Sequence, residues 1–496
     1  MSVNQQFKIM KQKLLYLLFL VLSASALKAQ FTTPNTGVTW DLDDLVTNAP
    51  TAITFSGGIY TLSQNLTIAP NDNLLIDSDV TLHMDANIQI TVQGDFTCDS
   101  NGIIITATNT AAPYNSIIFE TGSSGFMRNT TINYGKGIRL STGDFEMQSC
   151  TMSYHVPGTT TSSAINFSTG SPLINNSTFT FNNYPAFSSG ANQETSPTIS
   201  NNYLFANNQS NTNRPQINMG PSGADTLRIV GNTIIGDPTK IMVGGISASS
   251  LLGNQNKVII DGNTIRDNRY GITVVGANSS GFIRNNIIED NDTQNSPNLG
   301  GSGISLNASG ATTMNIIATN NQFRRNLWGI TVIGTARINL GDGDLNPGGN
   351  VFADNGNGGQ AYALFNNTAL PIMAMNNCWI EGATLTPTNV ENVISHQVDD
   401  ATLGLVTFTP FGCDALSIPS FSTSRPIIYP NPSNGIVTIS IIENGTASVF
   451  SINGMLIGKY NLNEGNNSIN LNLASGVYIL KTETSTSNYS QKLVIQ

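Results

Sequence analysis

The chain has 496 residues, of which only 10% are charged, and its formal net charge is −10. This balance argues against a nucleic-acid partner, which needs clustered Lys and Arg, and against a polybasic membrane-binding patch. Hydrophobic residues make up 39% of the chain, enough for a sizeable core, and the 46 glycines with few charges favour all-β repeats over disorder.

The first 29 residues have the three parts of a signal peptide. Lysines within residues 8–13 precede an apolar run over 14–22, and small residues then lead to Ala29. This order predicts cleavage after Ala29. A membrane anchor is disfavoured, because spanning a bilayer takes about 20 apolar residues. We therefore predict that residues 1–29 are removed and that the mature chain is exported and soluble.

A short motif recurs between residues 130 and 380 at intervals of 20 to 35 residues. Each copy has a small or polar residue two positions before an apolar one. The polar position is occupied by Thr130, Cys150, Ser177, Asn202, Asn232, Asn263, Asn286, Asn321, Asn350 and Cys378. Five residues further on, Asn recurs at Asn182, Asn207, Asn268, Asn291, Asn326 and Asn355, with Asp237 standing in once.

Such a repeat, with strand-length apolar runs and no helical pattern, predicts a solenoid. Coils stacked about 4.8 Å apart place equivalent residues over one another, so columns of Asn can hydrogen-bond along the stack. We predict an all-β fold with a parallel β-helix over 30–413, right-handed by the usual crossover preference. Residues 38–411 resemble the pectate-lyase-like right-handed β-helix superfamily. That resemblance implies the fold and transfers no catalytic residue.

Both ends of a solenoid need caps, because an open sheet edge would aggregate. A short amphipathic helix with Thr39 as its N-cap is predicted at the first end, before coils that begin at 66–92. At the other end, Thr386 and Pro387 predict a second short helix, followed by a closing segment over 399–411.

The four cysteines divide into two pairs. Cys98 and Cys150 are predicted to be buried and unpaired, because about two coils, roughly 10 Å, separate them. Cys378 and Cys413 flank the closing unit. They either form a disulfide in the oxidising periplasm or remain free, and the sequence leaves both alternatives open.

Residues 414–425, rich in Ser and Pro, predict a linker to a last domain over 426–496. There, alternating apolar and polar residues separated by Asn and Gly predict a small antiparallel β-sandwich. Its characteristic positions are Tyr429, Pro430, Asn431, Pro432, Gly435, Gly454, Gly476, Tyr478 and Lys481. With these residues the domain resembles the type A C-terminal sorting domain of type IX secretion cargo from Bacteroidetes. The resemblance implies handling by that secretion machinery, passage through the outer membrane, removal of the domain and usually attachment to the cell surface.

The repeat also predicts one charge cluster. Arg266, Glu289 and Arg324 occupy one repeat position, and Asp267, Asp290 and Arg325 occupy the next. A carboxylate pair about 5 Å apart suits a retaining glycosidase or a calcium ion. The alternative is a solvated ladder of salt bridges from Arg266 through Glu289 to Arg324, and this is the interpretation we favour.

Two further features are candidates for binding. Asp342, Asp344 and Asn346 alternate in a Gly-rich loop, which is typical of calcium ligands, although Pro347 stands where an EF-hand needs Gly. A plain turn is the favoured alternative. Tyr270 and Trp328 precede predicted strand starts, where they either stack on sugar rings or cover an edge of the core.

Three classes of function remain open. We favour a surface-displayed or secreted binding or adhesion protein with a polysaccharide or surface ligand. The alternatives are a polysaccharide lyase or glycoside hydrolase acting on an acidic polysaccharide, and a structural spacer. The three histidines have no zinc-ligand spacing, and the chain lacks a G-x-S-x-G elbow and a phosphate-binding loop. No cofactor is predicted beyond the calcium alternative.

Overall fold

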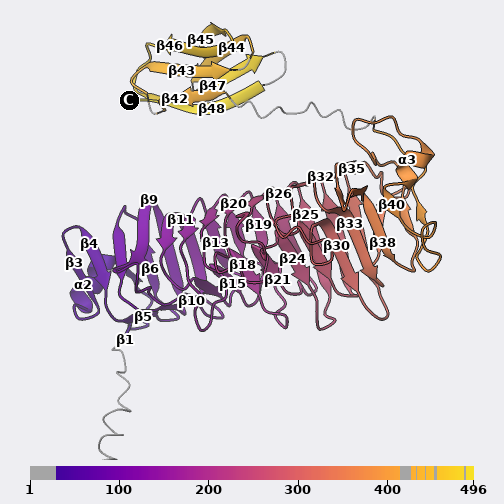
Figure 1. Ribbon diagram of the computed structural model, residues 1–496. Helices are drawn as coiled ribbons and strands as arrows, with labels where there is room; N and C mark the ends of the chain where they lie inside the picture. The colour runs from indigo at the N-terminus through magenta and orange to yellow at the C-terminus, as the bar shows by residue number, and fades with distance from the viewer. Residues whose placement is uncertain (1–29, 414–425, 432, 442, 452–454, 485–487) are drawn as a thin grey trace, which may run out of the picture. The chain divides into compact units, whose positions relative to one another are not determined.

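The computed structural model describes residues 30–413, 426–431, 433–441, 443–451, 455–484 and 488–496. The predicted signal peptide over 1–29 and the predicted linker over 414–425 lie outside the described residues. Contacts within the chain define two compact units, 1–413 and 414–496, and each is described by itself. In the first unit, successive coils of parallel strands follow one another from β1 to β40 (Figure 1).

One face of the coils is a single 14-stranded parallel sheet. In spatial order its strands are β1 (Gln30–Thr32), β5 (Asn65–Ile68), β8 (Ile90–Val92), β10 (Ile117–Phe119), β12 (Ile138–Leu140), β15 (Ile165–Phe167), β18 (Phe187–Ser189), β21 (Ile217–Met219), β24 (Ile246–Ser249), β27 (Ile272–Val275), β30 (Ser302–Ala308), β33 (Trp328–Gly334), β38 (Leu364–Thr368) and β40 (Ile394–Ser395). We call it sheet A.

Two further series of parallel strands complete each coil, and they share the long strands β9 (Asp95–Ala107) and β11 (Ser124–Asn133). The first series adds β2 (Thr39–Trp40), β6 (Asn73–Ile76), β13 (Phe145–Gln148), β16 (Leu173–Asn175), β19 (Thr198–Ser200), β22 (Thr226–Val230), β25 (Asn256–Asp261), β28 (Ser279–Arg284), β31 (Asn315–Thr319), β34 (Ile338–Gly341), β39 (Ile372–Ala374) and β41 (Val406–Thr407). The second adds β4 (Ile59–Leu62), β7 (Thr81–Met84), β14 (Thr151–Ser153), β17 (Thr178–Thr180), β20 (Tyr203–Phe205), β23 (Thr233–Ile235), β26 (Thr264–Arg266), β29 (Ile287–Glu289), β32 (Gln322–Arg324) and β35 (Val351–Ala353).

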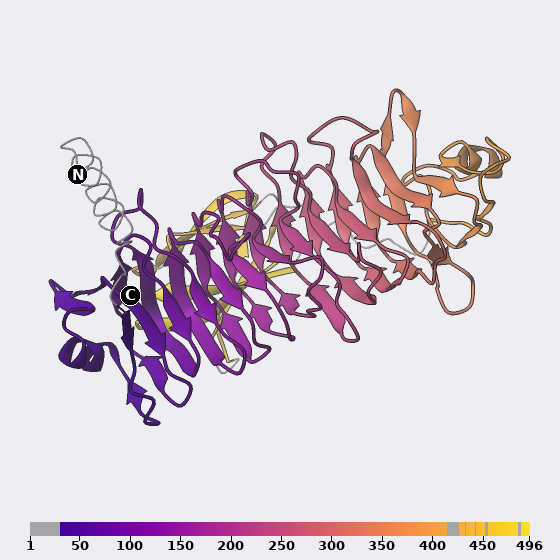
Figure 2. The same ribbon diagram turned by 90° about the horizontal axis from the view of Figure 1, so that it is seen from below.

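These strands form the predicted parallel β-helix, and Figure 2 shows the parallel strands side by side along the stack. Side chains alternate between core and surface along each strand, as a pleated backbone requires. In sheet A, for example, Ile272 of β27 pairs with Ile304 of β30, and both side chains are fully buried. One continuous apolar core therefore runs through the coils, and the outward side chains are free to form a site.

The first predicted Asn column is present and is hydrogen-bonded along the stack. At each rung the backbone N–H donates to the side-chain oxygen of the next rung. Asn286, for example, donates its N–H to Oδ1 of Asn321 at 3.1 Å, and its Nδ2 donates to the same oxygen at 2.9 Å. The rungs are Cys150, Ser177, Asn202, Asn232, Asn263, Asn286, Asn321, Asn350 and Asn377.

The prediction is wrong at the last rung, which is Asn377 and not Cys378. Cys378 forms a β-bridge with Val351, so the register places Asn377 opposite Asn350. Cys378 instead forms a disulfide with Cys413, which answers the question that the sequence left open. Cys98 and Cys150 are buried and free, as predicted.

The second column is also present, but Asp237 does not belong to it. Asp237 accepts hydrogen bonds from Gln209 and Thr239 outside the core. Gln216, which precedes β21, fills the missing rung. Its Oε1 accepts from Nδ2 of Asn207 at 3.0 Å, and its Nε2 donates to Oδ1 of Asn268 at 3.1 Å. The longer side chain of Gln spans the coil that carries no Asn.

The residue before each rung of the first column explains much of the Asn and Gly content. These residues have φ between 50° and 75° where the backbone turns: Asn176, Asn201, Gly231, Asn285 and Asn320 are examples. Asn and Gly tolerate this left-handed conformation better than other residues. The abundant Asn therefore serves two purposes, turning the backbone outside and bonding the coils inside.

Both predicted caps exist. Helix α2 (Leu42–Asn48) covers the first end, but its N-cap is Asp41 and not Thr39. Thr39 belongs to strand β2, where it is paired with Asn73 of β6. The first coil also begins earlier than predicted, since β1 pairs with β5. An antiparallel strand, β3 (Ile53–Ser56), pairs with β4 at this end. At the other end, α3 (Pro387–Glu391) has Thr386 as its N-cap and Pro at its start, as predicted.

His155 begins the second column and has an unusual environment. Its backbone N–H donates to Oδ1 of Asn182, Nε2 lies 2.9 Å from the carbonyl of Ile132, and Nδ1 has no hydrogen-bond partner among the described residues. Burial lowers the pKa of this imidazole from 6.5 to about 4. The folded state therefore holds the neutral ring.

We expect this histidine to make folding pH-dependent. Below pH 6.5 the unfolded chain takes up a proton that the folded chain does not, so stability is complete above that pH and decreases toward pH 4. The loss is about 3 kcal/mol at roughly 1.4 kcal/mol per pKa unit. His155→Asn keeps the rung and removes the titration, so urea unfolding of this variant should show a flatter pH profile. An identical profile would contradict this explanation.

The second unit contains two antiparallel sheets. One is formed by β42 (Ile427–Tyr429), β43 (Ile436–Ile441) and β46 (Gly465–Asn470), and the other by β45 (Leu456–Leu462), β44 (Gly445–Ser451), β47 (Gly476–Thr484) and β48 (Asn488–Ile495). Apolar residues of both sheets, including Val437 and Leu480, are buried in one shared cluster. This agrees with the predicted small antiparallel β-domain.

Candidate functional site

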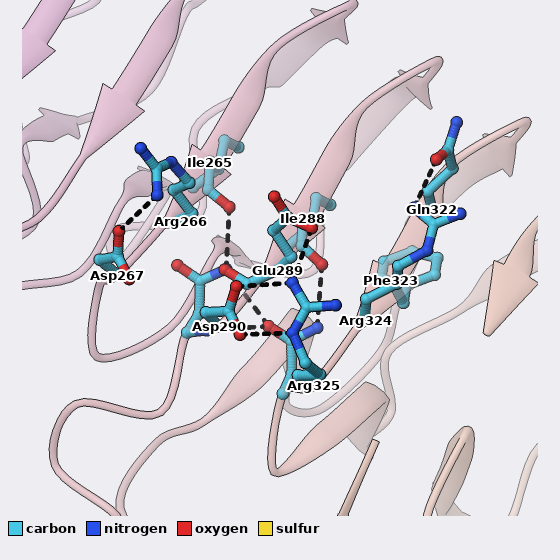
Figure 3. Close-up of polar contacts among 12 residues, drawn as sticks. Ile265, Arg266, Asp267, Ile288, Glu289, Asp290, Gln322, Phe323, Arg324 and Arg325 are labelled. Carbon is cyan, nitrogen blue, oxygen red and sulfur yellow. Dashed lines mark hydrogen bonds and ion pairs between the residues drawn. The ribbon is translucent and has the colours of Figure 1, made fainter. Parts of the chain in front are cut away.

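The predicted charge cluster lies at the ends of β26, β29 and β32 (Figure 3). Register places Arg266 beside Glu289, and Glu289 beside Arg324. The predicted salt-bridge ladder through these three residues is nevertheless wrong. Arg266 and Arg324 each pair with a carboxylate other than Glu289, and Glu289 pairs with the turn residue Arg325.

Arg325 is the central cation of this cluster. Its guanidinium donates to both carboxylate oxygens of Asp290 at 2.7 Å and to Glu289 at 3.0 Å. Arg266 pairs with its neighbour Asp267 at 3.1 Å, as Figure 3 shows. Arg324 turns toward Glu381 of a later coil and makes two bonds of 2.8 Å. Every acid of the predicted carboxylate pair is thus already paired with an arginine.

The electrostatics of this cluster agree with a structural role. The hydrogen bonds that Arg325 donates to Asp290 raise the pKa of its guanidinium, so it stays charged. Partial burial raises the pKa of Asp267, with the charge of Arg266 acting against that shift. The Arg325 side chain is 47% exposed, and ion pairs so accessible to water contribute little to stability. We therefore assign the cluster to the solvated surface.

The double variant Asp267→Asn with Asp290→Asn tests this assignment. We expect it to lose at most about 1 kcal/mol of unfolding free energy, because exposed pairs are screened by water. Ligand binding should equal that of the unmodified protein, and urea unfolding with a binding titration measures both. Loss of binding or of a polysaccharide-cleaving activity would return these two carboxylates to the candidate site.

The predicted calcium loop forms a turn. Oδ1 of Asp342 accepts the backbone N–H groups of Asp344 and Asn346, each at 2.9 Å. These bonds lower the pKa of Asp342 to about 2. Asn346 is buried and its Nδ2 donates to Asn339. The side-chain oxygens of Asp342 and Asn346 therefore accept hydrogen bonds from within the turn. The described part of the chain has no group of three acidic, His or Cys side chains arranged for a metal.

A cleft of about 430 Å³ lies over the outer face of sheet A, where β27, β30, β33 and β38 run side by side. Outward Ser, Thr and Asn side chains form its floor, and the loop before β30 forms one wall. Its lining residues are Asn213, Arg269, Tyr270, Thr273, Pro297, Asn298, Leu299, Gly300, Ser302, Ser305, Trp328, Thr331, Ile333, Phe365 and Asn367. This cleft brings together both aromatic residues singled out from the sequence.

Contacts between aromatic rings and one hydrogen bond fix the position of Trp328 in the cleft. The ring centroids of Trp328 and Phe365 are 5.3 Å apart and nearly parallel, and Tyr362 packs against Trp328 at 4.5 Å. The indole Nε1 of Trp328 donates to the carbonyl of Pro297 at 2.9 Å, which fixes the ring. Tyr270 also lines the cleft, and burial raises the pKa of its hydroxyl to about 12, so it is neutral at physiological pH.

Arg269 is the one charged side chain among the residues that line the cleft. Arg269 is only 8% exposed, yet every hydrogen-bond partner of its guanidinium among the described residues is neutral. Nε donates to Oε1 of Gln294 at 2.6 Å, and the two terminal nitrogens donate to Oδ1 of Asn213 and to the carbonyl of Leu299. The repeat positions did not single out this arginine, because its partners come from distant loops.

The predicted sorting residues lie in the second unit. The Asn431 side chain connects the first and last strands of this unit. Its Oδ1 accepts the backbone N–H of Val494 at 2.9 Å, and its Nδ2 donates to the carbonyl of Lys492 at 2.7 Å. Gly435 has a φ of 99°, which favours glycine.

The other predicted sorting residues lie in or beside the strands of this unit. The Tyr478 hydroxyl donates to the carbonyl of Ala474. Lys481 pairs with Glu483. Gly476 begins β47, and Pro430 is exposed beside β42, which ends at Tyr429. Pro432 and Gly454 lie outside the described residues.

Comparison with known proteins identifies the tail. Residues 427–496 match the family model described as secretion system C-terminal sorting domain. Fold and tail together define an exported β-helix protein. The protein is therefore cargo of the type IX secretion system, exported through the periplasm to the cell surface or the medium. Within the described ranges, no helix is long and apolar enough to cross a membrane.

The remaining comparisons concern the β-helix. No curated protein matches the chain. Among solved structures, the periplasmic alginate epimerase AlgG is 12% identical, with a TM-score of 0.32 over 75% of this chain and 83% of that one, and a point mutant of it has a TM-score of 0.34 over the same shares. A double mutant of the tailspike protein of E. coli bacteriophage HK620 is 12% identical, with a TM-score of 0.23 over 89% of this chain and 86% of that one.

Proposed function

We propose that this exported protein binds a polysaccharide through the cleft on sheet A, as a surface-displayed or secreted binding protein. The observation that carries this proposal is the composition of the cleft, which combines fixed aromatic rings with outward Ser, Thr and Asn side chains. Aromatic faces with a few polar groups are typical of ligand sites, since the rings exclude water and the polar groups orient the ligand.

The same lining favours binding over catalysis. Cleavage of a sugar chain needs a general acid or base within reach of the scissile bond, most often a carboxylate, His or Lys. The described residues that line the cleft include none of these. Tyr270 is a poor substitute as a base, because its raised pKa keeps it protonated at neutral pH.

A panel of acidic and neutral polysaccharides, titrated against the exported chain from residue 30 onward, tests the proposal. We expect binding without release of shorter sugars, and Trp328→Ala should weaken it roughly tenfold through loss of the ring face. Tyr203→Ala is the matched control, because Tyr203 is 40% exposed on β20, outside the cleft. Release of reducing or unsaturated ends would instead support a polysaccharide hydrolase or lyase.

A further inference from the structure

The cleft contains a buried cation whose charge is not balanced inside the protein. Arg269 has no carboxylate partner among the described residues, although the chain as a whole is acidic. Burying a charge is costly unless an opposite charge compensates it. The neutral oxygens around this guanidinium satisfy individual N–H groups but supply no negative charge, and Arg269 is one of the residues that line the cleft.

The hydrogen-bond capacity of Arg269 is also incomplete. A guanidinium has five N–H donors, and three of them have acceptors, one on each nitrogen. One N–H on each terminal nitrogen has no acceptor among the described residues. Two such donors in one plane match the two oxygens of a carboxylate, and charge-assisted pairs of this kind are the strong ones.

The surroundings of Arg269 hold it in place before any ligand arrives. Gln294 and Leu299 belong to the loop before β30, and Asn213 belongs to the loop before β21, so three contacts from two loops fix the guanidinium. The carbonyl of Arg269 also accepts the N–H of Gly301 at 2.8 Å. A cation fixed in this way binds with a smaller loss of side-chain entropy.

The other groups of the cleft fit a sugar ring better than a simple anion. Trp328 and Phe365, whose rings stack on each other, contribute apolar ring surface to the lining of the cleft. The hydroxyls of Ser302 and Thr331 lie 3.0 Å apart, and both can donate and accept. A ligand that carries a ring face, several hydroxyls and one carboxylate would use all of these groups together.

We propose that the cleft binds an acidic sugar unit, a uronate of a polysaccharide, with its carboxylate on the guanidinium of Arg269 and its ring beside Trp328. This inference rests on the proposed function and gives it a ligand class. The carboxylate supplies a counter-charge that none of the described residues provides. Neutral glycans therefore bind more weakly than acidic ones of the same length.

Calorimetric titration of the exported chain with short oligouronates and with their methyl esters tests this directly in the unmodified protein. Esterification removes the charge and keeps the ring. We expect the esters to bind roughly 10- to 100-fold more weakly, the range of a charge-assisted hydrogen bond. Equal binding of acid and ester would overturn the inference, even if no variant of Arg269 folds.

Variants then locate the effect. Arg269→Gln should remove the preference for the acid over the ester, and Arg269→Lys should restore it only in part, because Lys lacks the planar fork. Arg228→Gln is the control, since Arg228 is exposed on β22, outside the cleft. Far-ultraviolet circular dichroism checks that each variant is folded.

The outcomes separate this inference from the proposed function. If acid and ester bind equally and only Trp328→Ala weakens them, the protein binds glycans but Arg269 does not read the charge. If no sugar of the panel binds, both the proposed function and the acidic-sugar inference fail. Preference for the acid that Arg269→Gln leaves intact would place the recognition of charge elsewhere on the β-helix.

Discussion

Deleting residues 427–496 is expected to leave the protein in the periplasm. The deletion removes the whole segment that matches the sorting domain, while the β-helix keeps its own core and both of its caps. Export should therefore fail without unfolding of the first unit. Fractionation of cells into periplasm, surface and medium, followed by immunodetection of the β-helix, gives the measurement.

Two controls make this deletion specific. Tyr203→Ala in the full chain changes an exposed residue of the β-helix and should be exported normally. Residues 427–496 attached to an unrelated periplasmic reporter should carry that reporter to the surface, because their core is self-contained. Finding the truncated chain at the surface in normal amounts would show that the export signal lies elsewhere.

The largest effect on stability is expected from Asn286→Leu. Asn286 is fully buried and donates to the Ile260 carbonyl at 2.9 Å, while Asn263 donates to its Oδ1 through both N–H and Nδ2. Leucine removes these bonds and leaves the partners in the core without water. Each buried group left unsatisfied costs about 1–3 kcal/mol, so urea unfolding should show a total loss of about 3 kcal/mol or more.

Asn278→Leu is the matched control. Asn278 is exposed, although it donates to Gly253 and accepts from Thr313. Water replaces those bonds in the variant, so the loss should stay below about 1 kcal/mol. Similar losses at positions 278 and 286 would contradict the role of the Asn column.

The repeat made the fold predictable because stacking converts sequence spacing into spatial neighbours. Asn263 and Asn286 could be placed on adjacent coils from their positions alone, and their hydrogen bonds confirm it. Failures occurred where one coil departed from the repeat. Gln216 fills a rung from outside the periodic position, and only the fold brings it between Asn207 and Asn268.

The candidate site was less predictable for a related reason. Column positions specify which backbone segments are adjacent, but long charged side chains select partners from several coils. Arg324 accordingly turns to Glu381, and Arg325 takes Asp290. The surroundings of Arg269 depend on two loops that do not follow the repeat. Its burial, with no carboxylate partner in the part of the chain that the structure describes, could therefore be seen only in the structure.

The coil that supplies the wall of the cleft is the longest one in the first Asn column, with 35 residues between Asn286 and Asn321, whereas the shortest has 23. Extra residues in one coil leave the neighbouring Asn rungs in register, because the added loop begins and ends at strands of the same coil. The sequence of that loop, and with it the ligand specificity of the cleft, can therefore change during evolution while the stacked coils stay the same. Related exported chains are expected to share the frame and to differ in what they capture.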